Sequence, residues 1–342
     1  MNDQINEKPR SDGTLVEVRD LKKHFPVQAG LLERLMAKRI EYVRAVDGVS
    51  FVIHKGEVLG LAGESGSGKT TTGKLVIRLE EPTEGSVKFD GIDLQTLGDE
   101  EMRRLRRRMQ VIFQDPMASL NPRMTIGQAV GHPLQIHFPE QAGSHREMIY
   151  EILDKVGLSP PQFFIDKYAH QISGGQRQRV VIARALVTQP DLVLADEPIA
   201  MADVSVRALL LDLMIQLKNE FNLTYLFITH DLATAKYICD RIGIMYLGKL
   251  SEVAELREVY SHPLHPYTQA LLAAVPVPNP HKRRTQPMPV GEIPDAIHPP
   301  SGCRFHPRCP IVRLDHCPKV EPELRELRPG HFVACHYAEQ FL

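Results

Sequence analysis

An excess of charge of either sign is almost absent from this sequence. Its 342 residues carry 41 Lys and Arg against 42 Asp and Glu, which gives a formal net charge of −1. Proteins whose main task is to bind nucleic acid usually show a basic excess, so the composition argues against that class. The one dense basic run, 103–108, is interpreted as the solvated face of a short helix, because Met102, Leu105 and Met109 form an apolar stripe.

Long hydrophobic runs are lacking as well. The richest apolar segment, 209–217, is interrupted by Asp212 and Gln216 and is far shorter than the roughly 20 residues that cross a bilayer. The polar stretch 1–13 has no apolar region of the kind that signal peptides contain. We therefore expect the chain to be made and kept in the cytosol, with membrane association only through a partner. A hydrophobic content of 43% nevertheless supports a buried core.

Cysteine is scarce: the chain has five, and in a cytosolic protein these are not expected to form structural disulfides. Cys239 stands alone in a helical pattern and is predicted to be a small core residue. The other four follow residue 262, where fifteen of the 26 prolines lie and regular helices are expected to be scarce. Four thiolates suit tetrahedral Zn²⁺ or an iron–sulfur cluster, and either would staple a segment that has little means of building a core. The candidate ligands are Cys303, Cys309, Cys317 and Cys335, with His306, His316 and His336 as nearby alternatives.

The spacing of these four cysteines leaves the metal open. It lacks the C-x2-C pairs that are typical of zinc ribbons, and cysteines that hold no metal are a third alternative.

Hydrophobic periodicity predicts the fold class. Alternating apolar and polar positions over 15–56 predict β-strands at the start of a domain. Later, short apolar runs separated by helical patterns predict an α/β core with a largely parallel sheet. We expect a flexible tail at 1–14, a domain at 15–262 with a helical insert at about 115–172, and a separate C-terminal extension at 263–342. Buried strands are predicted at 58–62, 110–113, 192–195, 225–229 and 242–246.

A glycine-rich loop follows the first buried strand. Residues 63–70, GESGSGKT, match G-x-x-x-x-G-K-[ST] between a predicted strand and a predicted helix, the context that this phosphate-binding motif requires. The glycines let backbone N–H groups face phosphate oxygens, Lys69 adds positive charge, and the Thr70 hydroxyl can ligate Mg²⁺. The predicted nucleotide-binding residues are Gly63, Ser65, Gly66, Ser67, Gly68, Lys69, Thr70 and Thr71.

Two adjacent acids end the predicted strand at 192–195. Ligands bind at the carboxyl ends of strands in open α/β sheets, so Asp196 is placed to hold Mg²⁺ and Glu197 to polarise an attacking water. Gln114 and His230 each follow another predicted strand. Gln114 could reach the metal or the water, and His230 could contact the terminal phosphate. Taken singly, each of these residues is also compatible with an ordinary solvated turn.

Between these motifs lies Ser173-Gly174-Gly175-Gln176, followed by a helical pattern. A serine at this position can cap the helix, and the helix start with its adjacent glycines suits close approach to a phosphate. Alone, the tetrapeptide is equally compatible with a polar turn.

Five motifs together resemble the ATP-binding cassette (ABC) family of ATPases, over residues 15–262. In chain order they are the phosphate loop at 63–70, Gln114, the signature at 172–176, the acidic strand at 192–197 and His230. The resemblance implies a P-loop NTPase fold with a mostly parallel sheet, an antiparallel β part and a helical subdomain. It implies that two cassettes pair head to tail around two ATP molecules, so that Ser173–Gln176 acts on the ATP held by the partner. Phe25 matches the aromatic residue that stacks on adenine, and a buried core role is its alternative.

Several segments further resemble the ATP-binding subunits of bacterial oligopeptide/dipeptide importers, especially the second ATPase of a heterodimeric pair. That resemblance implies a four-iron–four-sulfur cluster on the late cysteines, with Zn²⁺ as the runner-up. It implies two membrane permease subunits as partners, contacted by the helical insert at the cytoplasmic face of the membrane, and indirectly an extracytoplasmic solute-binding protein. The segments are KKHFPV at 22–27, AVDGVSF at 45–51, FQDP at 113–116, SLNPR at 119–123, HPYT at 265–268 and the tail at 302–336.

The sequence departs from this subfamily at PIAMAD, residues 198–203. The subfamily has serine, alanine and leucine where this chain has Ala200, Met201 and Ala202, whereas Asp203 is kept. In the family this loop crosses the dimer interface near the partner's attacking water. Losing a hydroxyl and exchanging side-chain volumes there leads us to expect two ATP sites that turn over unequally.

The expected function is therefore ATP hydrolysis that drives peptide import. The alternatives are a soluble, non-transport ABC ATPase of the iron–sulfur assembly or repair type, a weakly hydrolysing regulatory subunit, and an importer ATPase for nickel or sugars. The single phosphate loop argues against tandem ribosome-associated cassettes, and the four-cysteine tail argues against assembly-type cassettes.

Overall fold

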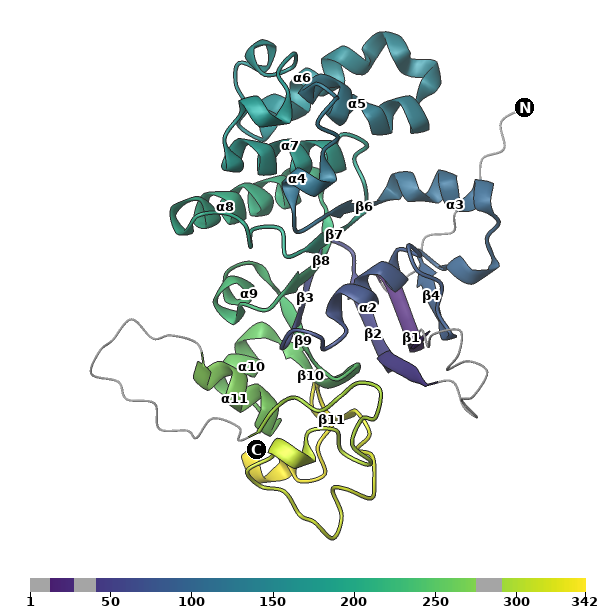
Figure 1. The fold of residues 1–342 in the computed structure, drawn as a ribbon, viewed down its shortest axis with the longest axis vertical. Coiled ribbons are helices and arrows are strands. Elements are labelled where there is room, and N and C mark those ends of the chain that lie inside the picture. Colours follow the sequence, from purple (N-terminus) through teal and green to yellow (C-terminus); the bar gives the residue numbers. More distant parts are fainter. Residues whose placement is uncertain (1–12, 28–40, 275–290) are drawn as a thin grey trace, which may run out of the picture.

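The computed structural model describes residues 13–27, 41–274 and 291–342, and its chain forms two β-sheets with helices packed around them (Figure 1). The expected tail at 1–14 lies almost wholly outside these residues. Figure 1 shows the helical part at one end, the C-terminal segment at the other, and the main sheet between them.

The main sheet has eight strands in the order β11-β12-β10-β9-β3-β8-β7-β6. The parallel strands are β6 (Met109–Ile112), β7 (Leu192–Asp196), β8 (Thr224–Thr229), β3 (Val58–Ala62) and β9 (Arg241–Tyr246). Every residue of β3, β7 and β8 is buried, which is the pattern expected where helices cover both faces of a parallel sheet. The predicted α/β fold with a largely parallel sheet is confirmed.

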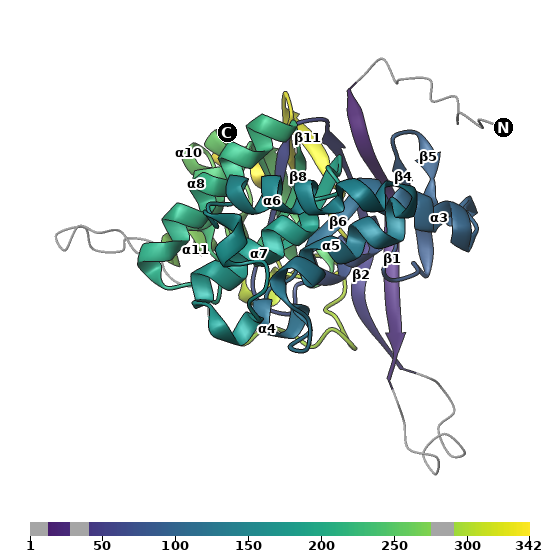
Figure 2. The same ribbon diagram turned by 90° about the horizontal axis from the view of Figure 1, so that it is seen from above.

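The second sheet is antiparallel, with the order β2-β1-β4-β5. Its strands are β1 (Thr14–Pro26), β2 (Tyr42–His54), β4 (Glu84–Phe89) and β5 (Ile92–Asp93). Figure 2 shows the long strands β1 and β2 standing at one side of the molecule. Their apolar faces share a core with the main sheet, in which Leu15, Val46 and Leu194 are members of one buried cluster.

Helices connect and cover the strands. Between β6 and β7 lie α4 (Pro116–Ser119), α5 (Ile126–His137), α6 (His145–Lys155) and α7 (Gly174–Leu186), so the expected insert at 115–172 is helical. Four arginines of the basic run are exposed while Met102, Leu105 and Met109 are buried, as predicted, whereas Arg108 is half-buried and pairs with Asp90. The other α-helices of the described residues are α2 (Lys69–Val76), α3 (Asp99–Leu105), α8 (Val204–Phe221), α9 (Leu232–Ile238), α10 (Leu256–Ser261) and α11 (Pro266–Ala274).

The C-terminal segment, which we expected from its prolines to be a separate extension, adds two strands to the main sheet. After β10 (Lys249–Glu255), the strand β12 (His331–Val333) pairs antiparallel with β10, and β11 (Arg325–Arg328) pairs with β12. Phe305 belongs to the main core, 2% exposed. Short strands at a sheet edge need few apolar residues of their own, because the existing sheet supplies the hydrogen bonds and the buried face.

One buried carboxylate joins this segment to the sheet. Glu252 of β10 is 0% exposed and accepts hydrogen bonds from the backbone N–H groups of Leu264 and His265, at 2.8 and 3.0 Å. It also lies 2.7 Å from Nε2 of His331, which is itself fully buried. Three donors from two distant stretches of the chain therefore converge on a single side chain.

His265 is held in its neutral form. Its Nδ1 accepts a hydrogen bond from the Tyr267 N–H at 3.0 Å, which a protonated ring cannot do. Burial lowers the pKa of His265 to about 4, although the Glu252 carboxylate and the Ala334 backbone act in the opposite direction.

This histidine should make the free energy of unfolding depend on pH. The pKa is lowered in the folded state, so the unfolded chain takes up the proton first as pH falls below about 6.5, and stability is lost between pH 6.5 and about 4. The largest loss is about 3 kcal/mol. His265→Asn keeps an acceptor without a titrating ring, and urea unfolding at several pH values should show a flatter profile. His262→Asn, an exposed histidine nearby, is the control, and equal profiles for wild type and His265→Asn would contradict the assignment.

Candidate ATP site and cysteine cavity

The phosphate loop runs from the end of β3 to the start of α2, as the sequence predicted. Gly63 and Gly68 have positive φ values of 150° and 101°, and a Cβ at either position would collide with a carbonyl oxygen, that of Met245 or Ala45. Only glycine allows this close backbone approach. The loop is thereby shaped for an anion to approach the start of α2.

Lys69 is folded back over this loop. Its Nζ donates to the carbonyl oxygens of Gly63 and Glu64, both at 2.8 Å, and lies 3.2 Å from Oγ of Ser67. Burial lowers the pKa of Lys69, while the carboxylates of Glu197, Asp196 and Glu64 partly oppose that shift. The ammonium group is thus already inside the loop where phosphate oxygens would replace the carbonyls as its partners.

Thr70 and Asp196 meet at the carboxyl end of β7. The Thr70 hydroxyl donates to Oδ1 of Asp196 at 3.0 Å, which brings together two of the predicted magnesium ligands. Burial raises the pKa of Asp196, an effect that the Thr70 hydrogen bond opposes. A hard divalent cation prefers carboxylate and hydroxyl oxygens, so this pair fits Mg²⁺.

Three predicted catalytic residues converge beside that pair. Oε2 of Glu197 accepts a hydrogen bond from Nε2 of Gln114 at 2.8 Å, and its Oε1 lies 2.8 Å from Nδ1 of His230. Strand β7 lies between β6 and β8, so the residues that follow these three parallel strands meet at one edge. Glu197 has a left-handed backbone with φ 46°, a strained conformation that is concentrated at functional sites.

The signature begins α7, away from α2 in the helical part (Figure 1). Oγ of Ser173 accepts from the Gln176 N–H at 3.2 Å, and the Gln176 side chain accepts from the Ser173 N–H at 2.9 Å. The predicted helix cap is confirmed and is a reciprocal capping box. A Cβ on Gly174 would meet open space, whereas one on Gly175 would press against Val206.

Phe25 lies near the end of β1 and is only partly buried, with Nζ of Lys23 4.9 Å from its ring centroid. Phe25 is therefore not a member of the buried core, and its stacking on adenine stays a prediction. In contrast, Cys239 is buried at 7% exposure, as predicted for a core residue.

All four late cysteines line one small cavity, together with His306 and His336. Burial raises the pKa of Cys303 to about 12 and of Cys309 to about 11, and the neighbouring cysteines add to both shifts. Among the residues that the structure describes, no group of three or more His, Cys, Asp or Glu side chains is arranged to hold a metal ion. The four cysteine side chains are thus gathered around one cavity.

Comparison with known proteins decides the family. Residues 46–200 match the ABC transporter family, and residues 251–317 match the oligopeptide/dipeptide transporter C-terminal region. The chain is 48% identical to the oligopeptide transport ATP-binding protein AppF of Bacillus subtilis, with 94% of this chain and 97% of AppF covered. The chain belongs to the ABC transporter ATPases.

Other relatives agree with this assignment. The ABC ATPase is 49% identical to a peptide import ATP-binding protein of Brucella ovis, over 94% of this chain and 97% of the relative. It also resembles the dimeric bacterial ABC transporter cassette MJ0796, which has been solved bound to ADP and Pi, with a TM-score of 0.60 and 30% identity over 71% of this chain and 99% of that one. The described helices include none that is both long and apolar enough to cross a membrane.

The loop that departs from the subfamily is on the surface of this ABC ATPase. Met201 is 65% exposed, and Arg207 donates to the carbonyl oxygens of Ala202 and Ala200, at 2.9 and 3.4 Å. Asp203 follows directly and precedes α8 without a side-chain capping bond. The exposed methionine therefore faces solvent in the single chain.

Sequence reasoning missed the residues that join the ATP site to the cysteine cavity. Arg308 pairs with Glu64 of the phosphate loop, and the Tyr267 hydroxyl accepts a hydrogen bond from the Glu64 N–H. Both signals were present, since Arg308 precedes Cys309 and Tyr267 lies in the HPYT segment, but nothing local to either residue indicates a partner so distant in the sequence.

Proposed function

We propose that this ABC ATPase is the subunit that hydrolyses Mg-ATP to drive peptide uptake through a membrane permease. The observation that carries the proposal is the convergence of Gln114 and His230 on Glu197, next to Thr70 and Asp196 and the phosphate loop. The peptide cargo is supported by the match at 251–317 and by the names of relatives that span almost the whole chain.

Within this proposal the loop 63–71 binds the phosphates, and Thr70, Gln114 and Asp196 hold the magnesium ion, which neutralises developing charge. Glu197 orients and polarises the attacking water, and its contacts with Gln114 and His230 aim its carboxylate. His230 would form a hydrogen bond with the terminal phosphate of ATP. Phe25 stacks on adenine.

We further propose that the signature Ser173, Gly174, Gly175 and Gln176 serves a second ATPase subunit in a heterodimer. What supports this is the position of α7 in the helical part, away from the chain's own phosphate loop (Figure 1). The helical insert would contact two permease subunits at the cytoplasmic face of the membrane, and an extracytoplasmic solute-binding protein would deliver the cargo to them.

The test is reconstitution of the complete transporter in proteoliposomes, with ATP hydrolysis and uptake of labelled peptides measured together. We expect peptide-dependent uptake that requires ATP and that Lys69→Ala abolishes. Hydrolysis without uptake by a chain that does not co-purify with a permease would instead indicate a soluble ABC ATPase. Uptake of nickel or sugars in place of peptides would refute the cargo.

We also propose that Cys303, Cys309, Cys317 and Cys335 hold a four-iron–four-sulfur cluster. The support is their arrangement around one cavity and the preference of such clusters for four thiolates. The cluster would supply a cross-link between distant parts of the C-terminal segment. Iron and acid-labile sulfide assayed on anaerobically purified protein should each approach about four per chain. Stoichiometric zinc without sulfide would refute the cluster.

The altered loop predicts unequal ATP sites in the assembled dimer. Ala200→Ser, Met201→Ala and Ala202→Leu together restore the subfamily pattern, and the complex should then hydrolyse ATP several-fold faster, since a hydrogen bond and a packing change of about 1–3 kcal/mol are involved. Arg207→Lys is the matched control for disturbing the loop without restoring the pattern. Unchanged turnover of the triple variant would contradict the hypothesis.

A further inference from the structure

The C-terminal segment contacts the phosphate loop at Glu64, the second residue of GESGSGKT. Nη1 of Arg308 lies 2.8 Å from Oε2 of Glu64, and Nη2 lies 3.1 Å from Oε1. This fork-to-carboxylate pairing fixes both distance and angle. The Arg308 side chain is 9% exposed and the Glu64 side chain is 29% exposed, so the pair is partly shielded from water.

A second contact holds the backbone of the same residue. The Tyr267 hydroxyl accepts from the Glu64 N–H at 2.9 Å, and Tyr267 is only 1% exposed. Its ring packs against Tyr246 and Phe305, with centroid distances of 4.7 and 5.3 Å. Glu64 is therefore fixed at its side chain and at its backbone by residues from outside the loop.

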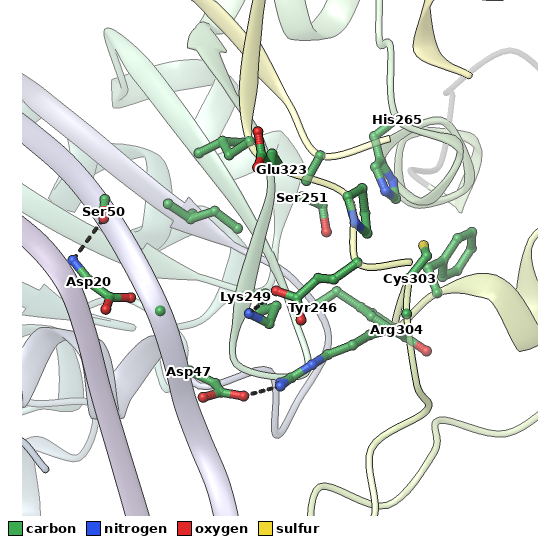
Figure 3. Close-up of a pocket in the computed structure, with 18 of the residues that line it drawn as sticks. Asp20, Asp47, Ser50, Tyr246, Lys249, Ser251, His265, Cys303, Arg304 and Glu323 are labelled. Carbon is green, nitrogen blue, oxygen red and sulfur yellow. Dashed lines mark hydrogen bonds and ion pairs between the residues drawn. The ribbon is translucent and has the colours of Figure 1, made fainter. Parts of the chain in front are cut away.

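A third contact reaches the other end of the loop. Arg304 donates to the Leu247 carbonyl and to Asp47, as Figure 3 shows for the Asp47 pair. The next residue, Gly248, donates its N–H to the Ser67 carbonyl at 2.9 Å. Arg304 thus holds the turn at Leu247 and Gly248, which in turn contacts the phosphate loop at Ser67.

Arg304, Phe305 and Arg308 all belong to residues 303–309, here named the cysteine loop. Its backbone forms two tight turns. The His306 N–H donates to the Cys303 carbonyl oxygen and the Arg308 N–H donates to the Phe305 carbonyl oxygen, both at 3.0 Å. The Cys303 N–H donates to the Cys317 carbonyl at 2.8 Å. A change in the position of the cysteines would therefore also move Arg304 and Arg308, the two residues through which this loop holds the phosphate loop.

The contact between Arg308 and Glu64 also changes the charge beside the phosphate loop. Nζ of Lys69 lies 2.8 Å from the carbonyl oxygen of Glu64, so the Glu64 residue lies beside the place where anionic phosphates would bind. An unpaired carboxylate there would repel ATP, and the Arg308 guanidinium neutralises it.

We propose that Arg308 and Tyr267 are positioning residues that set the affinity of the phosphate loop for ATP by holding and neutralising Glu64. The proposal rests on the proposed ATP-binding role of residues 63–70. It makes the cysteine loop a regulatory element of the ATP site, since displacing that loop would release Glu64. Chemistry at Glu197 is not touched by either residue, so the effect should fall on binding rather than on turnover.

The experiment measures the Kd for the fluorescent ATP analogue mant-ATP and the KM and kcat for ATP, on the full-length chain and on the assembled complex. Arg308→Ala should raise Kd and KM about tenfold, with kcat within about twofold of wild type. Arg308→Lys keeps the charge but loses the fork and should give an intermediate value. Tyr267→Phe keeps the ring and should weaken binding several-fold.

The double variant Glu64→Gln/Arg308→Ala decides between charge and packing. If neutralisation is the role of Arg308, the double variant should recover most of the affinity that Arg308→Ala loses, because no carboxylate is left unpaired. Arg328→Ala, an arginine of the same segment that pairs with Glu258 instead, is the matched control and should bind as wild type does. Thermal unfolding of each variant shows which are folded, and Arg308→Lys and Tyr267→Phe carry the test if Arg308→Ala is not.

The outcomes separate this inference from the proposed function. Wild-type chain that fails to bind mant-ATP, or a Lys69→Ala variant that binds it equally well, would refute the ATP site itself. Normal wild-type binding with Arg308→Ala and Tyr267→Phe both within twofold would overturn only the positioning role. A double variant that binds more weakly than Arg308→Ala would overturn the neutralisation argument.

Discussion

Glu197→Gln should lower ATP hydrolysis by the assembled transporter by about 10²–10⁴-fold and leave nucleotide binding nearly unchanged. Glutamine has the shape of glutamate, so the hydrogen bond from Gln114 can persist. It has no negative charge and no capacity to take a proton, so the water that Glu197 is placed to polarise would remain a weak nucleophile. Neither Lys69 nor Thr70 loses a hydrogen bond, since their partners are Gly63, Glu64, Ser67 and Asp196.

Phosphate release under saturating Mg-ATP and mant-ATP binding measure the two halves of this prediction. Glu220→Gln, which alters an exposed glutamate paired with Lys155, is the matched control and should hydrolyse as wild type does. Residual hydrolysis above a tenth of the wild-type rate would show that Glu197 is not the main base at this site. Loss of binding together with turnover would show that its role is to hold nucleotide.

Glu252→Ala should reduce the free energy of unfolding by about 3–5 kcal/mol. The substitution removes the only acceptor described for three buried donors, the N–H groups of Leu264 and His265 and the ring of His331. Each donor left without a partner costs about 1–3 kcal/mol, because water does not reach it. The loss should be concentrated where β12 pairs with β10, so the C-terminal segment should loosen first.

Urea unfolding gives the total loss, and limited proteolysis shows where the chain opens. Glu255→Ala, at the exposed end of the same strand, is the control and should change stability by less than about 0.5 kcal/mol. Cleavage first in the helical part, rather than between β10 and β12, would contradict the joining role of Glu252. If the cysteine loop positions the phosphate loop, Glu252→Ala should also weaken mant-ATP binding.

Local sequence was most informative where one stretch of chain carries a complete signal. The run 58–62 is wholly apolar and becomes a buried strand, and GESGSGKT places its glycines where only glycine can approach a carbonyl. Ser173 and Gln176 likewise contain both halves of their capping box. Such features depend on neighbours within a few residues, so composition and spacing suffice to predict them.

The sequence was least informative at the C-terminal segment. Its prolines indicated a separate, irregular extension, yet β12 joins the main sheet through Glu252, and Phe305 enters the main core. A strand three residues long has too little pattern to be recognised. Its stability comes from β10, to which it pairs across about eighty residues of chain.

The sequence by itself determined that this chain is an ABC ATPase of the oligopeptide/dipeptide type, because the family's motifs are short and contiguous. It also named Gln114, Glu197 and His230, since each follows a recognisable strand. Only the tertiary structure decided that these three side chains touch, as β7 lies between β6 and β8. Only the tertiary structure, too, joined Arg308 to Glu64, because an ion pair between residues 244 positions apart depends on how the chain packs and leaves no local pattern.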